Sequence, residues 1–141
     1  MKGVHPILSH SVLLVIGLFA MGMIIASMSS SLSKTERNLV TAEADYISEA
    51  LRLRILEIYS TVSQGGNFSG TFGLELPEKI GDQRYTILLD NDIITIELPF
   101  ENEMIEVNKT INIGVALGGE KMLPASLVVE KTGETITMDL V

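Results

Sequence analysis

The chain begins with a long uncharged segment. No Asp, Glu, Lys or Arg occurs from Val4 to Ser33, and residues 12–26 are almost wholly apolar. A helix needs about 20 apolar residues to cross the hydrocarbon layer of a bilayer, whereas the apolar part of a cleaved secretory signal has only about 7 to 15. The pattern therefore predicts a helix that belongs in a membrane or in an equally dry protein core, and that is long enough to be retained.

Helical periodicity continues into a charged segment, because no Pro or Gly interrupts residues 26–64. Apolar residues recur there at steps of three and four, which places them on one helical face. This first apolar line contains Val40, Ala44, Ile47, Leu51, Ile55, Ile58 and Val62. We predict one helix over 4–64, hydrophobic over 4–33 and amphipathic over 34–64, with Pro6 in its first turn and Gly65-Gly66 after its end.

A second apolar line lies beside the first and contains Leu39, Tyr46, Ala50 and Leu53. Two arrangements fit: one line packs under the C-terminal part and the other against neighbouring chains, or both pack on the chain's own sheet. Within the uncharged segment, Gly22 and Ala26 form a small-residue notch where helix backbones can approach closely, although small residues also occur on lipid-facing surfaces. Gly22, Ala26 and the first apolar line are the predicted helix-packing residues.

The period changes to two in the C-terminal half. Residues 65–73 are rich in Gly, Ser and Asn and predict a connecting loop. Beyond them, alternation typical of strands occurs in four groups: Tyr85, Ile87 and Leu89; Ile94, Ile96 and Leu98; Ile111, Ile113, Val115 and Leu117; Ile136, Met138 and Leu140. Turns are expected at 90–92, 118–119 and 132–133. The fold class is therefore α+β, with a head over 74–141 of about six or seven short antiparallel strands in a sandwich-like arrangement.

The composition argues against an enzyme. The only histidines, His5 and His10, precede the head and there is no Cys, so the head cannot contain a Ser-His-Asp or Cys-His site. The net charge is −8, with acidic residues concentrated in the C-terminal half, and such a surface repels nucleic acid. We expect no catalytic, cofactor or metal site and no nucleic acid partner.

Two acidic clusters are better explained as a turn and a solvated loop than as a metal site and a catalytic site. Asp90-Asn91-Asp92 resembles the start of a calcium loop, but Thr95 stands where that loop needs Gly, so a hairpin turn is favoured. The carboxylates Glu101, Glu103 and Glu106 predict a solvated acidic loop rather than an acid–base pair.

Two sequons, Asn67-Phe68-Ser69 and Asn108-Lys109-Thr110, fall in predicted loops. They make Asn67 and Asn108 candidate glycosylation sites and favour a head that faces outward. The charges flanking the apolar segment, Lys2 on one side and Lys34 and Arg37 on the other, do not assign an orientation.

The opening residues Lys2-Gly3-Val4-His5-Pro6-Ile7, followed at once by the apolar helix, resemble the class III signal peptide and N-terminus of archaeal type IV pilins. The segment Leu76-Pro77-Glu78-Lys79-Ile80-Gly81-Asp82-Gln83-Arg84-Tyr85-Thr86-Ile87 is similar to a Leu-Pro...Ile-Gly...Tyr-x-Ile segment of many pilin-like proteins. Bacterial type IV pilins carry Glu five residues into the mature chain. Leu8 stands there here, which fits the archaeal branch.

The resemblance implies that prepilin peptidase cuts between Gly3 and Val4, which makes 1–3 a short leader and Lys2, Gly3 and Val4 the processing residues. It also implies a homo-oligomer: a platform protein and its ATPase move the helix from the cytoplasmic membrane into a helical filament on the archaeal cell surface. Adhesion is the expected use, because it is the broadest in the family. The alternatives are a single-pass membrane-anchored β-domain binding module, or a minor pilin or archaellum-like component.

Overall fold

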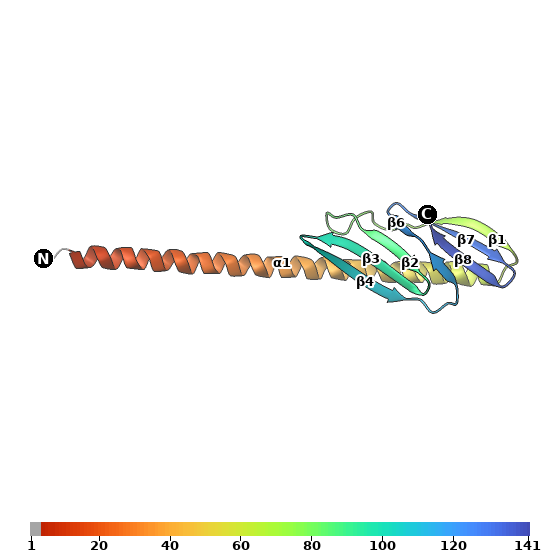
Figure 1. Ribbon diagram of the computed structural model, residues 1–141, viewed down its shortest axis with the longest axis horizontal. Coiled ribbons are helices and arrows are strands. Elements are labelled where there is room, and N and C mark those ends of the chain that lie inside the picture. The colour runs from red at the N-terminus through yellow and green to blue at the C-terminus, as the bar shows by residue number, and fades with distance from the viewer. Residues whose placement is uncertain (1–3) are drawn as a thin grey trace. The chain divides into compact units, whose positions relative to one another are not determined.

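The computed structural model describes residues 4–141, and the side chains from residue 12 onward. Its elements are α1 (Val4–Ser63), β1 (Phe68–Gly73), β2 (Thr86–Asp90), β3 (Ile93–Phe100), β4 (Glu103–Thr110), β5 (Ala116–Gly118), β6 (Glu120–Met122), β7 (Ser126–Thr132) and β8 (Thr135–Leu140). The predicted α+β class is confirmed (Figure 1). The chain divides after Asn38 into two units, of which the second begins at Leu39.

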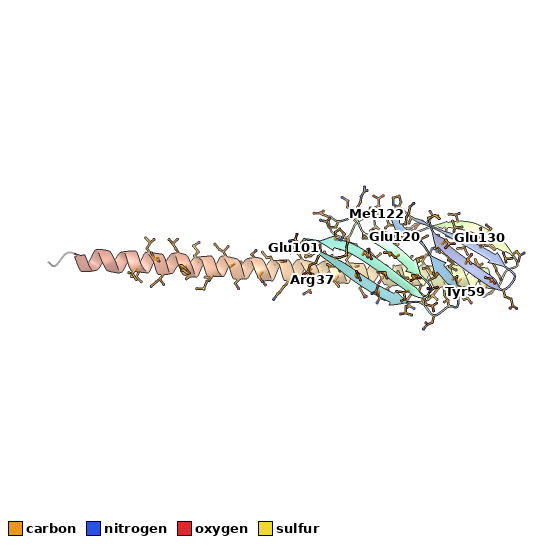
Figure 2. The ribbon with its side chains drawn as sticks, viewed as in Figure 1. Arg37, Tyr59, Glu101, Glu120, Met122 and Glu130 are labelled. Carbon is orange, nitrogen blue, oxygen red and sulfur yellow. The ribbon has the colours of Figure 1, made fainter. Side chains whose placement is uncertain are left out.

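The first unit is helical throughout its described part. Its side chains from residue 12 to Asn38 are exposed, apart from the half-buried Ser33. Figure 2 shows side chains projecting from opposite sides of this part of the helix. Because apolar residues surround the helix instead of following one face, no single contact can cover them all.

The second unit contains two four-stranded sheets and the rest of α1. The strand orders are β1-β7-β8-β5 and β4-β3-β2-β6, and every pair is antiparallel except β5 with β8. The backbone N–H groups of Leu89 and Asn91 donate hydrogen bonds to the carbonyls of Gly119 (2.8 Å) and Leu117 (3.1 Å), and so connect β2 to the β5 segment. The two sheets are therefore joined.

One hydrophobic core lies between the helix and both sheets. It includes the helical residues Ala44, Leu51 and Ile55, each fully buried, together with the inward-facing residues of the strands. Alternation sets which strand residues face inward: Ile94, Ile96 and Leu98 are buried on β3 while their neighbours are not. In Figure 1 the second half of α1 lies along the strands of both sheets.

The outward faces of the sheets are polar and largely acidic. Glu97 of β3 and Glu106 of β4 are direct cross-strand neighbours, and both point away from the core. Glu120 and Glu130, labelled in Figure 2, are exposed on β6 and β7. The outer face of the head thus carries the negative charge that the composition predicted for the C-terminal half.

Three hairpins have the same kind of tight turn. The connections β2–β3, β3–β4 and β7–β8 each have a two-residue loop, whose first residue has a positive φ: Asn91 (50°), Glu101 (53°) and Gly133 (65°). A left-handed residue lets a short loop follow the twist of the flanking strands. The predicted turn at 90–92 is confirmed, whereas the predicted acidic loop is wrong, because Glu103 and Glu106 belong to β4.

The predicted loop over 65–73 is wrong for residues 68–73, which form β1 at the edge of a sheet. Its glycines suggested a loop, but an edge strand paired with β7 accommodates them. Gly70 is covered by the ring of Phe68, so closely that a Cβ there would lie 2.6 Å from Phe68 Cζ. A larger residue at this position would require the Phe68 ring to move.

The predicted strand over 111–117 is also misplaced. β4 ends at Thr110, and only Ala116–Gly118 returns to a ladder, as β5 parallel to β8. Burial still alternates through Ile111, Val115 and Leu117, but Gly114 has a φ of +60°, which breaks the extended backbone. The described residues contain eight strands, more than predicted, and Asn108 lies on β4 and not in a loop.

Candidate functional site

The candidate site is the apolar segment, which we define as residues 12–32 of α1. Its large apolar side chains are more than half exposed, with Phe19 reaching 74%. Burying this many Leu, Ile, Val, Met and Phe side chains corresponds to a free energy on the order of 20 kcal/mol. The segment is also long and apolar enough to cross a membrane. It needs lipid or protein around it.

The predicted notch is present on the apolar segment. Leu18, Phe19, Gly22, Met23 and Ala26 line an open hollow of about 370 Å³. A Cβ added at Gly22 would meet no other atom within 4 Å, so the chain itself leaves this space unfilled. Small residues flanked by larger ones allow another helix to approach closely.

The two predicted apolar lines of the second half have different surroundings. The first line packs against the chain's own sheets: Ala44, Ile47, Leu51, Ile55, Ile58 and Val62 are buried and Val40 is partly buried. The chain's own sheets cover these side chains, which corrects their prediction as residues for packing between helices. The second line is largely uncovered, because Leu39, Tyr46 and Leu53 are exposed, with Tyr46 at 75%. The alternative in which both lines pack on the chain's own sheet is wrong.

Lys131 fastens the end of α1 to the head. Its side chain points inward from β7 and is buried, and its Nζ donates hydrogen bonds to the carbonyls of Val62 (3.0 Å), Ser63 (2.7 Å) and Gly65. Carbonyls at a helix C-terminus lack intrahelical partners and carry partial negative charge, so a cation there satisfies both needs. Lys131 was assigned no role from the sequence. The available signal was its period-two spacing from Leu127 and Val129, which places a charge on the buried face of a strand.

Further polar contacts hold the other side of the head to the helix. Lys109 of β4 forms an ion pair with Asp45 (2.8 Å), and the Gly81 N–H donates a hydrogen bond to Glu43 Oε2 (3.3 Å). The hydroxyl of the buried Tyr85 donates a hydrogen bond to the carbonyl of Pro77 (2.6 Å). Burial, and then the nearby Glu43 carboxylate, raise the pKa of Tyr85 above its ordinary value.

One ion pair lies within the helix itself. The Arg52 guanidinium donates hydrogen bonds to both carboxylate oxygens of Glu49. These bonds lower the pKa of the Glu49 carboxyl and raise that of Arg52. Both groups are solvent-accessible, so the pair adds little to folding stability.

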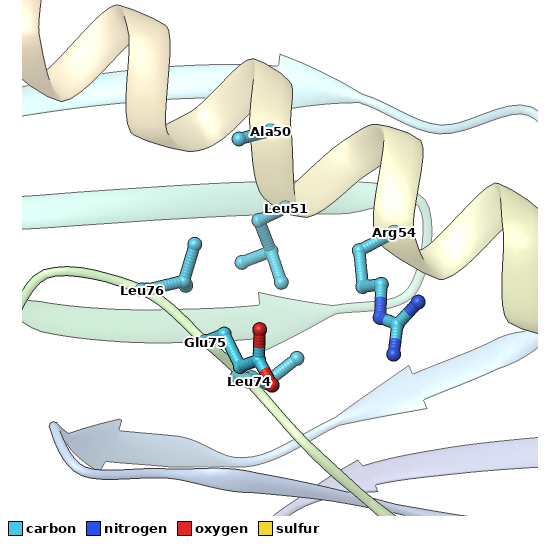
Figure 3. A pocket seen from close by; sticks show the side chains of 6 residues that line it. All are labelled: Ala50, Leu51, Arg54, Leu74, Glu75 and Leu76. Atoms are coloured by element: carbon cyan, nitrogen blue, oxygen red, sulfur yellow. The ribbon is translucent and has the colours of Figure 1, made fainter.

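A hollow of about 260 Å³ opens between the helix and the segment 74–76, and is lined by Ala50, Leu51, Arg54, Leu74, Glu75 and Leu76 (Figure 3). Leu51 and Leu74 are buried beneath it. Arg54 at its rim is paired with Glu57 (2.6 Å). Among the side chains described, from residue 12 onward, no three His, Cys, Asp or Glu residues lie close enough to hold a metal ion.

The remaining predicted residues fall into two groups. Lys2 and Gly3 lie outside the described residues, and Val4 begins α1 with its side chain, like those of His5 and His10, outside them as well. Both sequon asparagines are exposed. Asn67 Oδ1 accepts a hydrogen bond from the Gly133 N–H (3.0 Å), and Asn108 Oδ1 accepts one from the Thr95 hydroxyl (2.7 Å).

Comparison with known proteins finds no matching protein-family model and no significant match among curated proteins or solved structures. The function is therefore inferred from the surfaces of the molecule and from the N-terminal motif.

Proposed function

We propose that this chain is a pilin, the structural subunit of an archaeal type IV pilus-like surface filament that serves adhesion. The observation that carries the proposal is the uncovered apolar segment, which no other part of the chain covers within the described residues. Such a surface needs lipid in a lone subunit. In a polymer, the same segments of neighbouring copies cover one another instead, and the filament no longer needs the bilayer.

The surfaces of α1 suit an open polymer. The notch at Gly22 and Ala26 accepts a neighbouring helix, and the uncovered line of Leu39, Tyr46 and Leu53 supplies a second apolar contact. Contacts between different surfaces that do not close into a ring generate a helical filament. The acidic head then forms the outer surface, where the exposed Asn67 and Asn108 are accessible to glycosylation.

Prepilin peptidase cuts between Gly3 and Val4 at the cytoplasmic membrane, and a platform protein with its ATPase moves the subunit into the filament. The acidic surface of the head provides no attraction for nucleic acid.

A second candidate function is a membrane-anchored binding module. The hollow beside Leu51 and Leu74 favours it, since it is a concave surface on the head that the core leaves open (Figure 3). In that case the apolar segment serves only as an anchor, and the chain binds its ligand as a dispersed single subunit.

Electron microscopy of material sheared from the cell surface, combined with N-terminal sequencing of the purified chain, separates these functions. We expect filaments whose subunit begins at Val4. Finding the chain only as dispersed membrane-bound monomers under every growth condition contradicts the pilin proposal and favours the binding module. Filaments whose subunit retains residues 1–3 contradict the processing step alone.

A further inference from the structure

Among the edge strands of residues 4–141, β1 lacks the usual protection, whereas the β5 segment is hydrogen-bonded to the end of β2. Proteins prevent edge-to-edge pairing with short strands, charges or prolines at the edges of their sheets. Edge strand β4 carries Glu103, Glu106 and Lys109, and edge strand β6 has three residues, two of them charged. By contrast, β1 has six residues, Phe-Ser-Gly-Thr-Phe-Gly, with no charge and no proline.

The register of β1 against β7 shows which backbone groups face the free edge. The Leu74 N–H donates a hydrogen bond to the Ala125 carbonyl (3.3 Å), which continues the β1–β7 register by one pair. Bonded and unbonded pairs alternate in an antiparallel ladder, so Phe72, Gly70 and Phe68 are also bonded to β7. The N–H and C=O groups of Ser69, Thr71 and Gly73 therefore point to the open side. Within residues 4–141, β7 is the only strand that pairs with β1.

This edge is complementary to itself. If two copies of β1 pair antiparallel about a two-fold axis at Thr71, then Thr71 faces Thr71, and Ser69 faces Gly73 of the second copy. Each of these pairs joins residues whose hydrogen-bonding groups are unused, so the ladder is fully satisfied. The next pairs place Phe72 opposite Gly70 of the second copy, which is covered by the ring of its own Phe68. No charged residue of β1 opposes another.

We propose that β1 is a self-association surface, through which two copies of this chain join their heads by an antiparallel β1–β1 pair centred on Thr71. The pair is isologous, because the same surface serves both copies. It links two heads at their outer edges. Because the two-fold axis reverses one copy relative to the other, this contact is separate from the side-by-side helix packing of the proposed filament. The inference does not depend on filament formation.

Cysteine cross-linking tests the register, because the natural chain has no Cys. The full chain carrying Thr71→Cys is purified in detergent micelles and oxidised in about 1 M NaCl, where the screening length is roughly 3 Å and repulsion between acidic heads is suppressed. In the proposed register the Cα atoms of the two residues at position 71 are about 5.5 Å apart, within the range of a disulfide. We expect a disulfide-linked dimer that disappears on reduction.

The matched control is Ser69→Cys on the same exposed strand. In the proposed register the two residues at position 69 are separated by about 14 Å along the strands, too far for a disulfide. We expect this variant to remain monomeric. If Thr71→Cys stays monomeric, or if Ser69→Cys forms as much dimer, the proposed pair is refuted.

A proline variant tests the hydrogen bonds. Thr71→Pro removes an N–H that points away from β7, so the head keeps its own ladder, whereas Thr71→Val keeps the N–H. Chemical cross-linking of the otherwise natural chain through amines should give a dimer for Thr71→Val and lose it for Thr71→Pro. An unchanged dimer in Thr71→Pro, with its circular dichroism spectrum preserved, overturns the proposal. If Thr71→Pro is unfolded, the two cysteine variants decide the question.

Discussion

The two halves of α1 share one backbone conformation and have opposite surroundings. In the second half, one apolar line is buried against the sheets and polar residues occupy most of the rest. In the first half, apolar residues surround the helix and the chain covers none of their large side chains. The difference shows that hydrophobic content alone does not place a helix. The angular distribution of apolar residues decides whether a single sheet can cover it.

The largest effect should come from a charge in the notch. Gly22→Glu or Ala26→Glu places a carboxylate in an apolar surface that, in the proposed function, lipid and then neighbouring helices cover, at a cost of about 3 kcal/mol per subunit in a membrane. We expect loss of filaments, measured by electron microscopy of sheared surface material. Asn38→Glu is the control, since Asn38 is already polar and exposed. Normal filaments from Gly22→Glu would contradict helix packing at the notch.

A leucine-to-alanine substitution in each half of α1 compares how much the two halves contribute to the free energy of unfolding. Leu51→Ala empties a fully buried site in the head and should lower the free energy of unfolding by about 3 kcal/mol. Leu18→Ala shortens an exposed side chain and should change head stability by less than about 0.5 kcal/mol. Urea titration of the full chain in detergent, followed by near-ultraviolet circular dichroism, reports both. Equal effects would show that the head also depends on the apolar segment.

The contact between the end of α1 and the head should contribute to folding stability through Lys131. Lys131→Met keeps an apolar stem but leaves three carbonyls without their cationic donor, and should cost on the order of 2 kcal/mol of unfolding free energy. Lys121→Met, at an exposed residue of β6, is the matched control and should be nearly neutral. The same titration checks both, and similar values for the two variants would refute the anchoring role.

A smaller, pH-dependent effect is expected at Tyr85. Since its pKa is raised in the folded state, the fold favours the neutral phenol, so its contribution is complete below the ordinary value of 10.0 and falls as the pH rises above it. Tyr85→Phe loses the hydrogen bond to Pro77, about 1 kcal/mol at neutral pH. It should also reduce the loss of stability between neutral and strongly alkaline pH.

Urea midpoints measured across this pH range test the assignment. Tyr46→Phe is the control, because Tyr46 is largely exposed. A natural chain whose stability does not fall above pH 10, or a Tyr46→Phe variant that reduces the fall equally, would show that Tyr85 is not the responsible group.

Sequence periodicity predicted the helix, and it predicted those strands whose alternating apolar pattern is bounded by turn residues. The helix was predicted to within one residue of its end at Ser63, and β2, β3 and β8 coincide with alternating runs bounded by turns. β1 was missed because its glycines indicate a loop unless the aromatic ring covering Gly70 is known. β4 was missed because Glu103 and Glu106 indicated an acidic loop, although the buried Ile105 and Val107 alternate with them. The strand predicted over 111–117 was misplaced because alternation persists past Thr110 in a segment that Gly114 prevents from pairing.

The candidate site was predictable in part for a related reason. The uncharged segment and its notch can be read directly, since both are local in sequence. Which of the two apolar lines the sheets cover depends on where distant strands lie against the helix, and the sequence left both arrangements open. The role of Lys131 likewise requires knowing that β7 ends beside the terminus of α1, more than sixty residues away in the chain.

Glu97 and Glu106 stand side by side on the outside of the sheet, so their mutual repulsion is part of the folded state. Dissolved cations that gather around these carboxylates weaken the repulsion, while they change little in the apolar interior. The head should therefore become more stable as ionic strength increases, the reverse of a protein held together by surface ion pairs. In the proposed filament, the same repulsion would act between many identical heads. The spacing of the heads and the stiffness of the filament would then depend on ionic strength.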